Sequence, residues 1–170
     1  EISRLNLLLK ASETKHKLPE LGNNMKRGNS LIEDKAVTPQ AFDWRDNFTE
    51  IMGCGGFDIV IGNPPYFLLQ PQNTPKEILD LFKSKFTVAQ YKIDDFHLFL
   101  ERGISLLKQG GYLGFITPNT YLMNIYTTKL RKYILDTCAI VSITTIPKEV
   151  FPDASVDTSV IILKKEKSDK

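Results

Sequence analysis

The residues of this sequence that are best suited to carry out chemistry are four consecutive ones: Asn63, Pro64, Pro65 and Tyr66. They follow a run of β-forming residues at 57–61, so they stand where a buried strand ends. Two adjacent prolines fix the backbone angle φ and remove two N–H donors. The corner therefore cannot continue a β-ladder, and its carbonyl groups can face a ligand instead.

The corner offers two hydrogen-bond acceptors and one aromatic ring. Asn63 has a side-chain carbonyl, and Pro64 has a backbone carbonyl without an N–H of its own. Two adjacent acceptors suit an amino group, because they can hold both hydrogens of one nitrogen and make it more nucleophilic. The ring of Tyr66 is suited to stacking on a base drawn out of a duplex. The alternative is a rigid turn with a buried tyrosine, but ligands of open α/β sheets bind beyond such strand ends.

Hydrophobic periodicity predicts the elements that position this corner. The expected helices cover 1–12, 74–86, 94–110 and about 119–136, with one helical turn within 44–52; the expected strands cover 57–61, 112–117, 139–146 and 158–164, plus a short strand near Met25 that ends at Gly28. Asp94 or Asp95 is expected to cap the third helix, and Gly110 to stop it. This alternation predicts a mainly parallel α/β sheet. Since the stretch from Pro147 to Thr158 is too short for a crossover helix, the last strand should run antiparallel.

The composition is that of a globular domain and narrows the function classes. The chain has 170 residues, of which 42% are hydrophobic and 25% charged, and a net charge of +2 that does not by itself predict nucleic-acid binding. Cys54 and Cys138 have no metal-site spacing, and His16 and His97 are the only histidines, so no metal site is predicted. No apolar run approaches the length of a membrane span. We expect a cytoplasmic protein with no membrane partner.

The stretch "FDIVIGNPPY" resembles motif IV, [DNS]PP[YFW], of the adenine-specific (N6) DNA methyltransferases. Four further stretches are similar to the same family and most similar to the methylase part of type IIG restriction-modification enzymes: "KRGNSLI", "FDWRDNF", "IDDFHLFLERGISLLKQGGYLGFITPNTYL" and "EVFPDASVDTSVIILKK". The resemblance implies a class I S-adenosylmethionine-dependent methyltransferase fold, with a Rossmann-like sheet of order 3-2-1-4-5-7-6 whose strand 7 is antiparallel. The four strands from residue 57 onward would form its 4-5-7-6 portion.

The same resemblance implies methyl transfer from S-adenosylmethionine to adenine N6 in DNA, as part of a bacterial restriction-modification enzyme. Within the catalytic motif of Asn63, Pro64, Pro65 and Tyr66, the first two residues would accept hydrogen bonds from the target amine. Tyr66 would stack on the flipped adenine. Phe151 would be the second aromatic residue that clamps this base.

Cofactor contacts are implied at Asn29, Ser30 and Leu31, which correspond to motif III, and at Asn63. Many relatives carry Asp where this chain has Asn29, so the resemblance does not define which hydrogen bond Asn29 would make to the cofactor. Asp94 matches the acid of motif V, although a plain helix N-cap explains that residue equally well.

The sequence lacks two parts that the family uses to hold its cofactor, namely the glycine-rich loop of motif I and the acid that ends strand two. The chain therefore resembles a single partial catalytic domain, 1–170, in which 1–56 hold a helix, the motif III strand and a linker, and 57–170 hold motifs IV to VIII. We expect the strand near Met25 to lack its neighbours in the sheet. We also expect the isolated chain to be inactive, and its exposed edge at 57–61 to favour self-association.

Two alternatives stay open at this point. The same pair of acceptors would serve an amino-methyltransferase that acts on RNA or on a protein glutamine. The missing cofactor loop would also fit a non-enzymatic methyltransferase-like module that binds nucleic acid.

Overall fold

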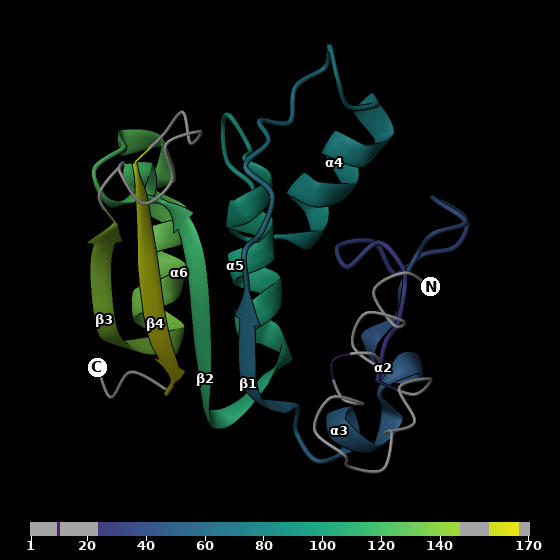
Figure 1. The fold of residues 1–170 in the computed structure, drawn as a ribbon. Helices are drawn as coiled ribbons and strands as arrows, with labels where there is room; N and C mark the ends of the chain where they lie inside the picture. Colours follow the sequence, from purple (N-terminus) through teal and green to yellow (C-terminus); the bar gives the residue numbers. More distant parts are fainter. Residues whose placement is uncertain (1–9, 11–23, 147–156, 167–170) are drawn as a thin grey trace. The chain divides into compact units, whose positions relative to one another are not determined.

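A computed structural model describes residue 10, residues 24–146 and residues 157–166 of the chain (Figure 1). The helix expected at 1–12 and the side chain of Phe151 lie outside the described residues. The chain divides into two compact units, residues 1–47 and residues 48–170. None of the helices among the described residues is both long and apolar enough to cross a membrane.

The first unit contains a looped segment and the short helix α2, Trp44–Asn47. The prediction of a strand near Met25 is wrong, since residues 24–28 form no strand and only Asn29 makes an isolated bridge, to Ala41. A strand needs a hydrogen-bonded neighbour, and residues 24–28 have none among the described residues; Gly28 packs instead against Phe42, where a Cβ atom would lie 2.7 Å from the ring side chain. This segment is held by close contact with one ring and not by a neighbouring strand.

The second unit is built on a four-stranded sheet of order β1-β2-β4-β3. The strands are β1 (Phe57–Gly62), β2 (Leu107–Pro118), β3 (Cys138–Ile146) and β4 (Thr158–Lys165), and the short helix α3 (Thr49–Gly53) precedes them. β1 and β2 are parallel, whereas β4 runs antiparallel to both β2 and β3. The predicted 4-5-7-6 order and the antiparallel last strand are both confirmed.

Three longer helices accompany the sheet: α4 (Lys76–Lys85), α5 (Asp95–Leu106) and α6 (Thr128–Thr137). α5 contacts β1 and β2, α6 contacts β3, and both lie behind the sheet in Figure 1. A Cβ atom at Gly103 of α5 would meet the side chains of Leu113 and Phe115, so these β2 residues face that helix. This interface forms the core, which includes the fully buried side chains of Leu98, Leu100, Ile104, Leu113, Ile161 and Leu163.

Two predicted helix boundaries are wrong. α5 ends at Leu106 and not at Gly110, because the fully buried Leu107 already pairs with Phe57 in the sheet. The helix expected from residue 119 begins instead as two 3-10 turns, Asn119–Leu122 and Ile125–Thr127, before α6. Polar side chains compete with the helical pattern there, since Asn124 Oδ1 accepts from the N–H of Tyr126 at 2.9 Å.

Candidate functional site

The predicted corner, residues 63–66, lies at the carboxyl ends of two parallel strands. Gly62 of β1 is level with Phe115 of β2, so the corner leaves the sheet beside Ile116. The hydroxyl of Tyr66 lies 3.1 Å from the backbone oxygen of Ile116, which it can donate to. The corner is therefore joined to the end of the neighbouring strand.

Tyr66 and Asn63 are brought together by a direct contact. The Tyr66 hydroxyl lies 3.0 Å from Asn63 Oδ1 and donates to it. A phenol has one hydrogen and here faces two acceptors, Asn63 Oδ1 and Ile116 O, so it can move from one to the other without losing a partner. Asn63 Oδ1 can thus be released to accept a hydrogen from a substrate, while Tyr66 stays bonded to the sheet.

The ring of Tyr66 is held from behind by α5. It packs edge-on against Phe96, with centroids 6.3 Å apart and an interplanar angle of 79°, and it is partly exposed. Partial burial raises the pKa of the Tyr66 phenol, which keeps the hydroxyl protonated as a donor. The ring is therefore fixed in place while part of it can meet a ligand. Pro64 is buried next to it, whereas Asn63 and Pro65 are exposed.

The segment after the corner is hydrogen-bonded to the start of α5. The N–H of Leu69 donates to Ile93 O at 2.8 Å, and the N–H of Asp95 donates to Phe67 O at 3.0 Å. These two bonds keep the corner and the helix start in register. Residues 63–69 and 93–96 consequently form one connected structure at this end of the sheet.

Three titratable groups at the start of α5 are shifted toward their neutral forms. Asp94 occupies the predicted N-cap position, and one of its carboxyl oxygens, the buried Oδ1, has no hydrogen-bond partner among the described residues. Burial raises the pKa of Asp94, and backbone N–H groups near the carboxyl lower it by less. Burial, and then the charge of Asp94, raise the pKa of Asp95 to about 6. Burial lowers the pKa of His97 to about 4. A buried carboxyl oxygen without a partner is the kind of group that a polar ligand would satisfy.

The predicted motif III residues belong to the first unit. Asn29 Oδ1 accepts from the N–H of Leu31 at 3.0 Å, so its carbonyl is used within its own turn. The carbonyl of Ser30 accepts from the indole Nε1 of Trp44 at 3.1 Å, and Leu31 is buried. To a ligand the Asn29 amide offers its N–H donors and the second lone pair of Oδ1, whereas Asp at this position would offer only acceptors.

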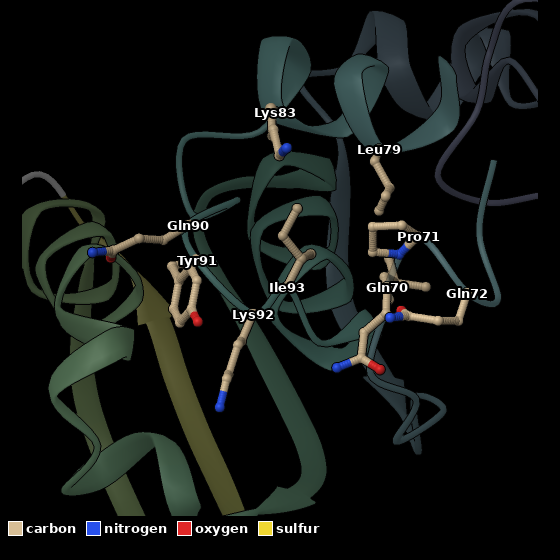
Figure 2. A pocket seen from close by; sticks show the side chains of 10 residues that line it. Gln70, Pro71, Gln72, Leu79, Lys83, Gln90, Tyr91, Lys92 and Ile93 are labelled. Atoms are coloured by element: carbon tan, nitrogen blue, oxygen red, sulfur yellow. The ribbon is translucent and has the colours of Figure 1, made fainter. Parts of the chain in front are cut away.

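A pocket of about 290 Å³ lies beyond the corner, and the sequence reasoning missed it (Figure 2). Its walls come from three segments: the loop 69–72, the helix α4 and the loop 90–93. The lining residues are Leu69, Gln70, Pro71, Gln72, Leu79, Lys83, Gln90, Tyr91, Lys92 and Ile93. The one signal that could have marked it is the run Gln90-Tyr91-Lys92, which places an aromatic ring and a cation just before a helix start.

Comparisons with solved structures identify the fold. A protein from Listeria monocytogenes described as a class I S-adenosylmethionine-dependent methyltransferase matches with a TM-score of 0.54 and 26% identity, over 68% of this chain and 33% of that one. The type ISP restriction-modification enzyme LlaBIII, solved bound to DNA, matches with a TM-score of 0.53 and 19% identity, over 84% of this chain and 11% of that one. The second unit therefore has part of the class I methyltransferase fold, as predicted.

Comparisons of sequence identify the family. The model of the Eco57I restriction-modification methylase family matches residues 1–151, so the chain belongs to that family. The Escherichia coli type II restriction enzyme and methyltransferase RM.Eco57I is 34% identical over 155 residues. That alignment covers 89% of this chain and 15% of the relative, so the chain spans about a seventh of the relative's length.

Proposed function

We propose that the chain forms the catalytic corner of an enzyme that transfers a methyl group from S-adenosylmethionine to the N6 amine of adenine in DNA, within a restriction-modification system. The observation that carries the proposal is the contact of Tyr66 with Asn63 at the carboxyl ends of β1 and β2. It puts the acceptor pair and the aromatic ring in one place. The family match and a DNA-bound relative of the same fold support it.

Asn63 and Pro64 act on the amine that is to be methylated. The Asn63 side-chain carbonyl and the Pro64 backbone carbonyl accept one N–H each, which draws the nitrogen lone pair out of conjugation with the ring and toward the methyl donor. When the amine arrives, the Tyr66 hydroxyl turns from Asn63 to the Ile116 carbonyl, 3.1 Å away. Its ring then stacks on the flipped base, with Phe151 proposed on the opposite side.

The residues present fit a cofactor only in part. S-adenosylmethionine supplies an activated methyl group on a positively charged sulfur. The Asn29 amide nitrogen is a donor for ring nitrogens of its adenine, and Ser30 and Leu31 form the turn that holds Asn29. Because motif I and the strand-two acid are not in this sequence, we propose that the chain alone binds the cofactor weakly and is inactive.

The exposed edge of β1 supports a further proposal about the isolated chain. β1 pairs with β2 on one side and with no other strand among the described residues, and Ile59 and Ile61 are exposed on it. A free edge with large apolar residues favours pairing with a second chain. We propose that the isolated chain self-associates there and that its functional location is the cytoplasm, where its DNA substrate would be.

A chimera tests the catalytic role of Asn63. In it, this chain replaces the matching 155-residue stretch of the Escherichia coli relative, and methyl incorporation is measured on duplex DNA, RNA and a glutamine peptide. We expect incorporation at adenine N6 of DNA, and a loss of about 10²–10³-fold in the turnover number for Asn63→Ala with cofactor affinity little changed.

The matched control is Asn63→Asp, which keeps an acceptor at the same position and should retain far more turnover than Asn63→Ala. Full turnover by Asn63→Ala would exclude the acceptor role. Methylation confined to RNA or to the peptide, by a chimera that circular dichroism shows to be folded, would exclude the DNA substrate.

A further inference from the structure

The pocket beyond the corner has a lining suited to a phosphate-bearing ligand. Its ten lining residues include two lysines and three glutamines, and none of them is acidic. Lys83 extends from α4 on one side, while Gln90, Tyr91 and Lys92 come from the loop before α5 and Gln70 and Gln72 from the loop after the corner (Figure 2). Lys83 Nζ lies 3.9 Å from Asp80, an exposed pair too weak to hold the ammonium against a phosphate.

An aromatic pair lies beside Lys92. Tyr91 is 66% exposed and Tyr126 is 44% exposed, and their ring centroids are 5.3 Å apart. Lys92 Nζ lies 5.8 Å from the centroid of Tyr91 and 6.0 Å from that of Tyr126, within the range of a cation–π contact. Exposed rings next to a free ammonium are the combination that proteins use to bind single-stranded nucleic acid.

The backbone of Lys92 is unusual for its residue type. Its φ of 58° is in the left-handed region, which a residue with a long side chain seldom adopts. A strained backbone of this kind persists where the surroundings hold it and often marks a ligand-binding position. Here the conformation accompanies the position of the ammonium over the two tyrosine rings.

The distance between the corner and the pocket limits which nucleotides, counted from the target base, could reach the pocket. Leu69, the first lining residue, is three residues after Tyr66, a path of at most about 11 Å. Successive nucleotides of one DNA strand are about 3.4 Å apart along the helix axis, so the near wall of the pocket lies within about three base steps of Tyr66. The hydrogen bond from Leu69 to Ile93 fixes the pocket to the same connected structure as Tyr66.

We propose that this pocket binds the DNA strand that carries the target adenine, about one to three nucleotides from it. Lys83 and Lys92 bind phosphates, Tyr91 stacks on a flanking base, and Gln70 offers its amide group to base edges. The proposal rests on the proposed function, because the target adenine defines the strand. It adds a site of strand binding that is separate from the methylation corner.

The experiment measures DNA binding by the 170-residue chain itself, and therefore does not require methyl transfer. Fluorescence anisotropy follows a labelled single-stranded oligonucleotide and a duplex with adenine opposite an abasic site, over a range of salt concentrations. We compare Lys83→Gln, Lys92→Asn and Tyr91→Ala with two controls, Lys85→Gln and Tyr112→Ala. Asn is chosen at 92 because it tolerates the left-handed backbone.

We expect each lysine variant to lower the slope of log affinity against log salt by about 0.7 for the single strand. Tyr91→Ala should weaken binding about 5- to 150-fold with little change in slope. Lys85 lies two residues after Lys83 and thus on another side of α4, and Tyr112 is on β2, so both controls should bind as the unsubstituted chain does.

A cross-linking experiment places the strand. Oligonucleotides that carry 5-iodouracil at successive positions around the target adenine should cross-link to Tyr91 most strongly at one to three nucleotides from it. Absence of oligonucleotide binding, equal binding by pocket and control variants, or cross-linking elsewhere would overturn the pocket proposal. Loss of adenine methylation in the chimera would instead overturn the proposed function. Because one assay measures DNA binding and the other methyl transfer, a negative result in one does not prevent interpretation of the other.

Discussion

The two faces of the sheet in the second unit differ in how they are covered, although β1 carries apolar residues on both faces. On the face toward α5 and α6, Leu113 and Leu163 are fully buried. On the opposite face, Ile59 is 63% exposed and Ile61 is 80% exposed. A sheet with one solvated face usually places polar residues there, whereas near-continuous apolar strands are typical of a sheet covered on both sides.

The strands also differ in whether both of their edges are paired. β2 is paired on both sides, but β1 has a pairing partner only in β2 among the described residues. Edge strands that remain exposed in native proteins commonly carry inward charges, proline or a bulge that prevents pairing. β1 carries Ile59 and Ile61 along its length and has a charge only at its start, where Asp58 pairs with Lys108. β1 therefore has the composition of an interior strand, and the corner at 63–66 directly follows it.

The largest effect expected from this comparison is on the state of association. The unsubstituted chain should sediment as a dimer or larger species, because the open face and the edge of β1 can be buried against a second copy. Ile61→Lys should shift it toward the monomer. Analytical ultracentrifugation measures the change, with Met123→Lys as a control in which an exposed apolar residue outside the sheet receives the same charge. A monomeric unsubstituted chain would show that the open face does not drive association.

Replacing one glycine on each face of the sheet by alanine adds a single methyl group and tests how tightly that face is packed. At Gly103, on the covered face, an added Cβ would lie 2.7 Å from Leu113 Cδ1 and 3.0 Å from Phe115 Cζ. At Gly114, in β2, the nearest atom would be Ile61 Cγ2 at 3.8 Å, an ordinary contact. Gly103→Ala should lower the free energy of unfolding by about 1–3 kcal/mol, and Gly114→Ala should change it by less than about 1 kcal/mol. Urea denaturation measures both, and equal losses would contradict the difference in packing.

The sequence predicts most of this sheet because its strands are short apolar runs with clear boundaries. The order of the four strands, the antiparallel β4 and the corner at 63–66 all follow from pattern and resemblance. The end of α5 does not, because helix periodicity continues through Leu107 and only the pairing with Phe57 ends the helix there. The strand near Met25 is likewise not formed, because a strand requires a paired neighbour and residues 24–28 have none among the described residues.

The site was predicted in its residues but not in its contacts. The corner sequence indicates which groups can accept hydrogen bonds, and the roles assigned to Asn63 and Tyr66 stay predictions. Nothing in the sequence indicates that the Tyr66 hydroxyl donates to Asn63 Oδ1, because that contact depends on the path of the corner beside Ile116. The pocket joins residues up to 24 positions apart, from 69 to 93, and their proximity depends on the pairing of Leu69 with Ile93.

The smallest expected effect is on how stability depends on pH. It differs between the titratable groups of the covered helix α5 and those of the exposed strands. On the strands, ion pairs favour the charged forms, since Lys108 lowers the pKa of Asp58 and Glu166 raises that of Lys164. On α5, burial favours the neutral forms of Asp95 and His97. Burial of these two groups gives stability profiles that slope in opposite directions with pH.

The signs follow from proton uptake by the folded and unfolded states. The pKa of Asp95 rises from 3.8 to about 6 on folding, so the folded state holds the extra proton and stability falls as pH rises through that window. The pKa of His97 falls from 6.5 to about 4, so the unfolded state binds the extra proton and stability rises with pH through that window. Between about pH 4 and pH 6 the two contributions oppose each other. Asp95→Asn should therefore make the slope of stability against pH more positive than in the unsubstituted chain, and His97→Gln should make it more negative. Each difference should be about 1 kcal/mol once solvent screening is allowed for. Urea denaturation across this range measures both slopes, and parallel profiles for the two variants would mean that burial on α5 does not shift these groups as the structure indicates.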